Sequence, residues 1–165
     1  MKAAASALAG AASLAALPAG ALEAPTGAVL LTLTGLLRKA NHGTKAHFDM
    51  AMLEALPQLT HTTRTPWYAQ SRRFTGPLLR DVLSAAGAHG SRLRLSALND
   101  YQVDMPVDDA QRYDVIVARL LDDKPLGVRD KGPLFVMYPF DSRRELRTAV
   151  YYGRSVWQLR SIEVL

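Results

Sequence analysis

The feature that most constrains the fold is a series of short, strand-like apolar runs into which a few helices are inserted at irregular intervals. Turn-forming residues separate the runs, which cover residues 28–37, 93–97, 113–121, 132–139 and 155–165. Regular alternation of strands and helices would favour a doubly wound parallel sheet. The irregular order instead predicts a mixed α+β fold, mainly β, with a few inserted helices.

Two segments have clear helical spacing. In "FDMAMLEAL" the apolar side chains recur at helical intervals, Asp49 is placed to cap the helix, and Pro57 ends it. In "FTGPLLRDVLSAAGAHG" Pro77 is expected in the first turn and Gly87 at the C-terminal stop. Its predicted apolar face consists of Leu78, Leu79, Val82, Leu83 and Ala86. A further short helix is expected near Asp108, which is placed as its cap.

Composition excludes several functional classes. The 165-residue chain contains no cysteine, so it forms no disulfide and offers no thiolate as nucleophile or metal ligand. Its net charge of +5 is moderate and its basic residues are interspersed with acidic ones, so no nucleic-acid partner is expected. The common nucleotide, hydrolase and zinc-peptidase motifs are absent from the sequence.

The N-terminal segment resembles a secretory signal. One lysine, an alanine-rich apolar stretch, Pro18 and then Ala19-Gly20-Ala21 predict a signal peptide over residues 1–21, cleaved before Leu22. An uncleaved anchor or a frayed helix is the alternative reading. No Arg-Arg pair precedes the apolar stretch, so the twin-arginine route is not indicated. The expected product is a single domain over residues 22–165, periplasmic or secreted, with no stable membrane span after processing.

The stretch "LTHTTRTPWYAQSRRFTGPLLRDVL" gathers hydroxyls, cations and aromatic rings. Arginine forks and threonine hydroxyls suit anions, and flat rings on a backbone stiffened by Pro66 suit planar groups. The candidate ligand-binding residues in it are Thr63, Arg64, Trp67, Arg72 and Arg73. In the alternative interpretation, Trp67 is a core residue under a loop and the arginines are surface charges.

Metal ligation is not expected. The four histidines are scattered over predicted loops and turns, and the aspartates between Asp100 and Asp109 do not match the spacing of a calcium-binding loop. Turns and helix caps account for these aspartates more simply. The pair Arg143-Arg144, with Glu145 and Arg147, has the character of a solvated helix face.

The order of the motifs resembles a known family. The segments "FTGPLLRDVLSAAGA", "ALNDYQVDMPVDD", "DVIVARLLDDKPLGVRDKGPLFVMYPFD" and "VWQLRSIEVL" are similar to the molybdopterin-binding domain of the sulfite-oxidase and methionine-sulfoxide-reductase type. The likeness covers most of residues 70–165 and implies a sulfite-oxidase-like fold. It also implies a cofactor pocket, whose rim would include the threonine and arginine cluster and, in addition, Tyr101, Tyr138 and Arg154.

This chain departs from the family pattern at the metal ligand. Family members hold molybdenum through one cysteine, and by the spacing to Trp67 its counterpart here is Thr63. A threonine hydroxyl cannot replace a soft thiolate. We therefore expect a non-catalytic periplasmic module without molybdenum, which binds a small anion or a periplasmic or membrane protein partner. The alternatives are a molybdopterin-dependent oxidoreductase, or its subunit, that holds the cofactor without a thiolate, and a purely structural subunit.

Overall fold

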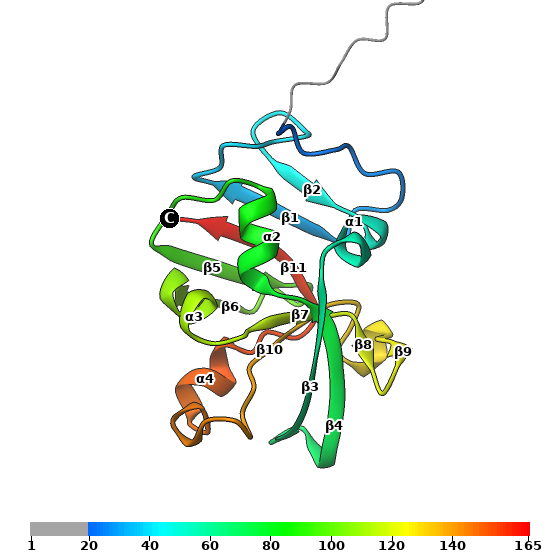
Figure 1. Ribbon diagram of the computed structural model, residues 1–165, viewed down its shortest axis with the longest axis vertical. Coiled ribbons are helices and arrows are strands. Elements are labelled where there is room, and N and C mark those ends of the chain that lie inside the picture. The colour runs from blue at the N-terminus through cyan, green and yellow to red at the C-terminus, as the bar shows by residue number, and fades with distance from the viewer. Residues whose placement is uncertain (1–19) are drawn as a thin grey trace, which may run out of the picture.

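The computed structural model describes residues 20–165 and has a mixed α+β architecture built mainly from sheet (Figure 1). This confirms the predicted fold class. Residues 1–19 of the expected signal peptide lie outside the described residues. Within residues 20–165, no helix has the length and apolar character needed to cross a bilayer.

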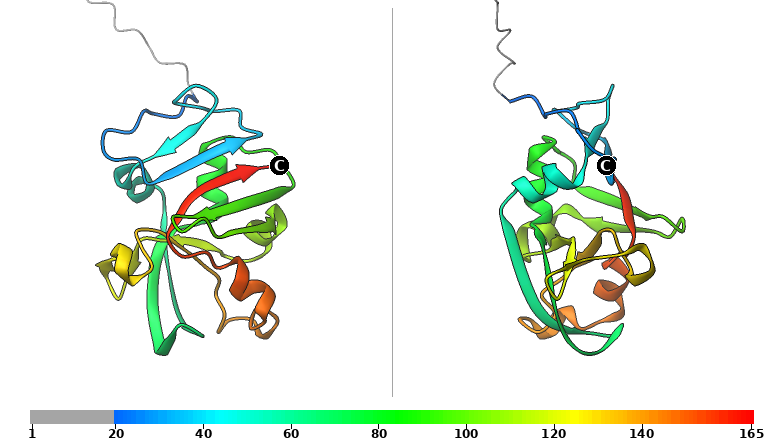
Figure 2. Two further views of the ribbon diagram at one scale, coloured as in Figure 1. Left: turned by 180° about the vertical axis from the view of Figure 1, so that it is seen from behind. Right: turned by 90° about the vertical axis from the view of Figure 1, so that its right-hand side faces the viewer.

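A five-stranded sheet forms the upper half of the molecule in Figure 1, with α2 packed against one face, as the turned views in Figure 2 also show. In spatial order its strands are β2 (Ala46–Phe48), β1 (Leu31–Gly35), β11 (Leu159–Val164), β5 (Arg92–Ala97) and β6 (Gln102–Pro106). The β1–β11 pair is parallel and the other pairs are antiparallel. Alternate residues such as Leu31, Leu33, Leu93 and Leu95 are fully buried, which fixes the register of this sheet.

A long hairpin runs from the middle of the molecule to its lower end in Figure 1, as the views in Figure 2 also show. It consists of β3 (Gln58–Thr65) and β4 (Tyr68–Pro77). Two short strands, β8 (Leu120–Leu121) and β9 (Lys124–Pro125), extend this sheet: β8 pairs with β4, and β9 pairs with β8. A separate antiparallel pair, β7 (Ile116–Ala118) and β10 (Phe135–Met137), is buried throughout. Pattern analysis of the sequence did not predict the hairpin, because its threonines and arginines lack an alternating apolar face.

The helices are short. They are α1 (Met50–Ala55), α2 (Leu79–Ala85), α3 (Val107–Arg112) and α4 (Ala149–Arg154), with the 3-10 turns η1 (Val128–Asp130) and η2 (Arg144–Leu146). Asp49 caps α1 as expected, accepting a hydrogen bond from Met52 N at 2.9 Å. Further N–H groups, of Thr26 and Gly27, donate to the same carboxylate, and the hydrogen bonds from Met52 and Gly27 lower the pKa of Asp49.

Two expected helix positions were wrong by a few residues. Pro77 is the last residue of β4 and lies before α2, whose cap position is Leu78. Asp108 lies in the first turn of α3, after the cap position Pro106. The Gly76-Pro77 dipeptide instead serves a crossing of strands: a Cβ on Gly76 would lie 2.0 Å from the carbonyl oxygen of Val117, so only glycine lets β4 approach β7 this closely.

Candidate functional site

The sequence-predicted site residues fall into separate places. Thr63, Arg64 and Trp67 lie at the end of the hairpin near the segment 139–152, whereas Arg72 and Arg73 face the β8–β9 turn. Tyr138 and Arg154 meet at a buried carboxylate, and Tyr101 lies over α4. The eight residues therefore do not form one continuous rim.

Thr63 is a structural contact. Its side chain is buried, and its hydroxyl accepts the Asp141 N–H at 3.0 Å and donates to the Arg64 carbonyl at 3.3 Å. This hydroxyl ties the hairpin to the segment that begins at Asp141. Both its donor and its acceptor are engaged, and its hard oxygen is unsuited to molybdenum.

Beside Thr63 lies an open cleft of about 420 Å³, here called the arginine cleft. Its walls are formed by Arg64, Thr65, Pro66, Asp141, Arg147 and Tyr152. Asp141 lies between the two arginines: its carboxylate accepts the Arg64 backbone N–H at 2.9 Å and the Arg147 guanidinium at 3.0 Å. Arg147 is also held by a hydrogen bond from its Nε to the Phe140 carbonyl at 3.0 Å.

Two groups in the lining residues of this cleft lack internal partners. The Arg64 guanidinium has no carboxylate within ion-pair distance anywhere in residues 20–165. The Thr65 hydroxyl also lacks a hydrogen-bond partner in the same part of the chain, but this oxygen is buried and is not accessible from the cleft. With two guanidiniums and one carboxylate, the cleft has a net positive charge and unused donors, which suits a small anion.

Trp67 belongs to an aromatic cluster. Its ring lies 5.3 Å from Phe135, 5.9 Å from Trp157 and 6.0 Å from Tyr152, in tilted or edge-to-face arrangements that stabilise the end of the hairpin. Most of the Trp67 side chain is therefore packed against other side chains, as in the interpretation of Trp67 as a core residue. One side of the cluster still lines a smaller, mostly apolar pocket of about 270 Å³, together with Tyr101.

Arg72 and Arg73 are engaged internally. The Arg72 Nε contacts Asp122 at 2.5 Å, the Arg73 Nη1 contacts Asp123 at 3.1 Å, and Arg73 N–H donates to Asp122 at 3.0 Å. Asp122 and Asp123 both adopt left-handed φ values in the turn between β8 and β9. The Arg73 N–H and the Arg72 guanidinium lower the pKa of Asp122. These arginines position a turn and do not face the arginine cleft.

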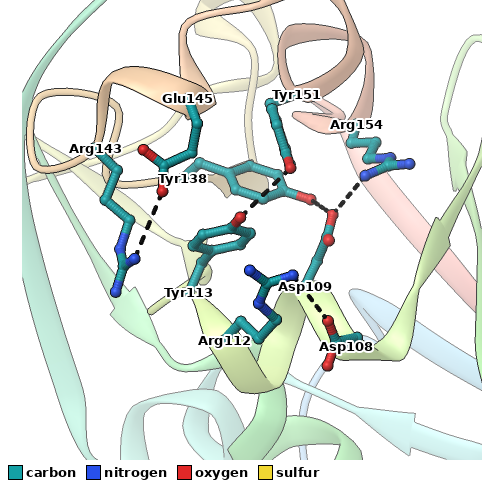
Figure 3. A network of polar contacts seen from close by, with 9 residues as sticks. All are labelled: Asp108, Asp109, Arg112, Tyr113, Tyr138, Arg143, Glu145, Tyr151 and Arg154. Carbon is teal, nitrogen blue, oxygen red and sulfur yellow. Dashed lines mark hydrogen bonds and ion pairs between the residues drawn. The ribbon is translucent and has the colours of Figure 1, made fainter.

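The buried carboxylate is Asp109 of α3 (Figure 3). It accepts hydrogen bonds from the Tyr138 hydroxyl at 2.7 Å and from the Arg154 guanidinium at 2.8 Å. Tyr138 is fully buried, and its burial, together with the bond to Asp109, raises the pKa of its hydroxyl above the ordinary tyrosine value. This network joins α3, the residue after β10 and α4, so Tyr138 and Arg154 are structural.

The residues that complete the arginine cleft were missed by sequence reasoning. Asp141 and Arg147 come from "DSRRELR", which was interpreted as a solvated helix face, and Tyr152 comes from α4. The signal that could have found them is the resemblance itself, because its "MYPFD" segment ends at Asp141. Which of the nearby charges faces the hairpin is decided by the path of residues 141–148, and no periodic pattern encodes that path.

Comparisons with known proteins place the fold. No family model matches the chain, and no curated protein matches it. Among solved structures, the sulfane dehydrogenase SoxCD from Paracoccus pantotrophus has a similar fold, with a TM-score of 0.58 and 16% sequence identity. The match covers 81% of this chain but only 37% of the SoxCD chain. At this level of identity the likeness shows a shared fold.

The residues present do not fit a thiolate-held molybdenum centre. The chain has no cysteine, and the threonine at the expected ligand position has its hydroxyl engaged on both sides. Within residues 20–165 no group of three or more histidine or acidic side chains converges as a metal site. No chemical step through molybdenum is therefore derived for this chain.

Proposed function

We propose that this chain is an exported, non-catalytic binding module, periplasmic or secreted, that has a molybdopterin-enzyme fold without molybdenum and binds a small anion in the arginine cleft. The observation that carries the proposal is the Arg64 guanidinium, which lines an open cleft beside Arg147 and has no carboxylate within ion-pair distance among residues 20–165. A small anion accepting from both arginines would replace water at Arg64 and compete with Asp141 for Arg147.

Calorimetric titration with inorganic sulfate and inorganic phosphate tests this proposal. We expect saturable binding of one of these anions at one site per chain, weakened about tenfold in Arg64→Ala because a charge-assisted hydrogen bond is lost. Arg129→Ala is the matched control, since Arg129 is also exposed, forms no ion pair within the described part of the chain, and lines neither this cleft nor the aromatic pocket. Equal affinity in wild type and Arg64→Ala, or no binding of either anion, would overturn the proposal.

The fold shared with SoxCD favours one second candidate, a molybdopterin-dependent oxidoreductase or subunit that takes the cofactor without a thiolate. Metal analysis of the full chain, purified from cells that make the cofactor, separates the two. Stoichiometric molybdenum or a fluorescent pterin would establish the second candidate. Their absence, together with anion binding, would support the first.

A further inference from the structure

A second, larger cleft is lined by different residues from the arginine cleft and also has more cationic than anionic side chains. It has a volume of about 670 Å³ and is here called the basic cleft. Its charged lining consists of Arg112, Arg143, Arg144, His61, Asp114 and Glu145. Asp114 is paired at 2.8 Å with Arg80 and Arg112 contacts Asp108 at 3.5 Å, and neither Arg80 nor Asp108 belongs to the lining. Three guanidiniums against two carboxylates leave the cleft with a net positive charge.

Two of these guanidiniums are held by one buried ring. Arg112 lies 5.5 Å and Arg143 5.4 Å from the centroid of the Tyr113 ring, whose exposed fraction is only 4%. Figure 3 shows both arginines extending from different elements toward this tyrosine. Stacking on a fixed ring orients a guanidinium while its N–H donors stay available, which lowers the entropy lost on binding.

The donors of these arginines are only weakly engaged within the chain. Arg112 contacts Asp108 at 3.5 Å and Arg143 contacts Glu145 at 3.6 Å, both longer than the 2.8 Å contact of Arg154 with Asp109. Arg144 has no carboxylate within ion-pair distance in the part of the chain that the structure describes. Three forked donors spread over an open hollow suit several carboxylates on one flexible segment better than a single small ion.

An anionic membrane surface is a poorer fit to the same charges. A bilayer surface cannot enter a hollow, and surface-bound proteins commonly add exposed apolar side chains that insert between headgroups. The large exposed apolar residues between 20 and 165 do not line this cleft; they are Val29, Leu36, Leu98, Tyr101, Val128 and Val150.

We propose that the basic cleft is a docking site for an acidic peptide segment of a partner protein, recognised by Arg112, Arg143 and Arg144. The proposal does not depend on anion binding in the arginine cleft, which uses different side chains. Binding through carboxylate–guanidinium pairs at an open surface is expected to weaken as ionic strength rises.

Fluorescence anisotropy with a labelled oligoglutamate peptide tests the docking site on the full chain. We expect saturable binding that weakens about fivefold in Arg144→Ala and is lost in the double variant Arg143→Glu/Arg144→Glu. An oligoglutamine peptide of equal length is expected not to bind, and Arg129→Ala, at an exposed arginine that does not line the basic cleft, is expected to bind the acidic peptide as wild type does. Because the three arginines are exposed, thermal unfolding should show that both variants fold.

Three outcomes would overturn the docking proposal. One is equal peptide affinity in wild type and the double variant. Another is absence of saturable peptide binding at low ionic strength. The third is sedimentation with vesicles containing anionic phospholipid while the acidic peptide fails to compete.

Discussion

Two aspartate–arginine contacts flank the same C-terminal segment, and they differ in burial far more than in length. Arg154 meets Asp109 at 2.8 Å, with side-chain exposures of 22% and 7%, whereas Arg147 meets Asp141 at 3.0 Å, with exposures of 46% and 34%. Contact distance therefore does not separate the buried pair from the pair that lines the arginine cleft. Solvent access separates them.

The physical reason is desolvation. A buried carboxylate that loses its partners remains charged in a low-dielectric environment without compensating contacts, which strongly destabilises the fold. The contacts of Asp109 with Tyr138 and Arg154 are therefore expected to stay formed in the folded protein. An exposed pair contributes only about 0–1 kcal/mol, because water solvates both ions when it opens. A ligand can therefore displace Asp141 from Arg147 at little cost, and none can do so at Asp109.

Breaking the buried contact should give the largest effect. In Asp109→Ala, Arg154 and the Tyr138 hydroxyl lose their shared acceptor, and we expect the free energy of unfolding to fall by about 3–5 kcal/mol. Denaturant unfolding monitored by tryptophan fluorescence measures this. The matched control is Asp108→Ala, whose exposed carboxylate meets Arg112 at 3.5 Å and should change stability by no more than about 0.5 kcal/mol. Equal losses of stability in Asp109→Ala and Asp108→Ala would contradict the stronger structural role given to the buried carboxylate.

Removing only the tyrosine hydroxyl should give a smaller, pH-dependent effect. Tyr138→Phe loses one hydrogen bond to a charged acceptor, which at neutral pH costs about 1.5–3 kcal/mol. The raised pKa keeps Tyr138 protonated in the folded state above pH 10, where the unfolded chain releases that proton, so wild-type stability should fall as pH rises above about 10.

The pH dependence distinguishes this role from simple loss of packing. In Tyr138→Phe the decline in stability above about pH 10 should be shallower than in wild type, since one tyrosine with a raised pKa is gone. Unfolding free energies measured at several pH values between neutral and alkaline check the slope. Parallel curves for the two proteins would show that Tyr138 does not titrate on unfolding.

The elements predicted from sequence are those that local patterns encode. The helix after Asp49 was predicted with its cap, and alternating or continuous apolar runs revealed β5, β10 and β11. The β3–β4 hairpin was missed because its strands are polar and neither face has a regular row of apolar residues. The hairpin is stabilised by the aromatic cluster around Trp67, whose members are far apart in sequence. Propensity rules do not register such contacts.

The candidate site was predicted only in part, for a related reason. Arg72 is the cross-strand partner of Thr63 and leaves the hairpin on the same face, but its guanidinium is bound by Asp122 of the β8–β9 turn. The sequence shows neither this pairing nor the carboxylate that binds the guanidinium. Arg72 and Arg73 are thus engaged by Asp122 and Asp123, while Arg64 stays in the cleft. Residue type was informative about chemistry, and only the fold could assign each arginine a partner.

The smallest effect should come from the exposed contact, and it should appear in binding more than in stability. Asp141→Asn removes the negative charge that competes with an anion for Arg147 but keeps one oxygen to accept the Arg64 N–H. Two charges about 4 Å apart in water interact by about 1 kcal/mol, so affinity for the anion that wild type binds should rise up to about fivefold. Stability should fall by less than about 1 kcal/mol. Calorimetric titration beside denaturant unfolding measures both. If affinity instead fell while the protein stayed folded, Asp141 would orient Arg147 for the ligand and would not compete with it.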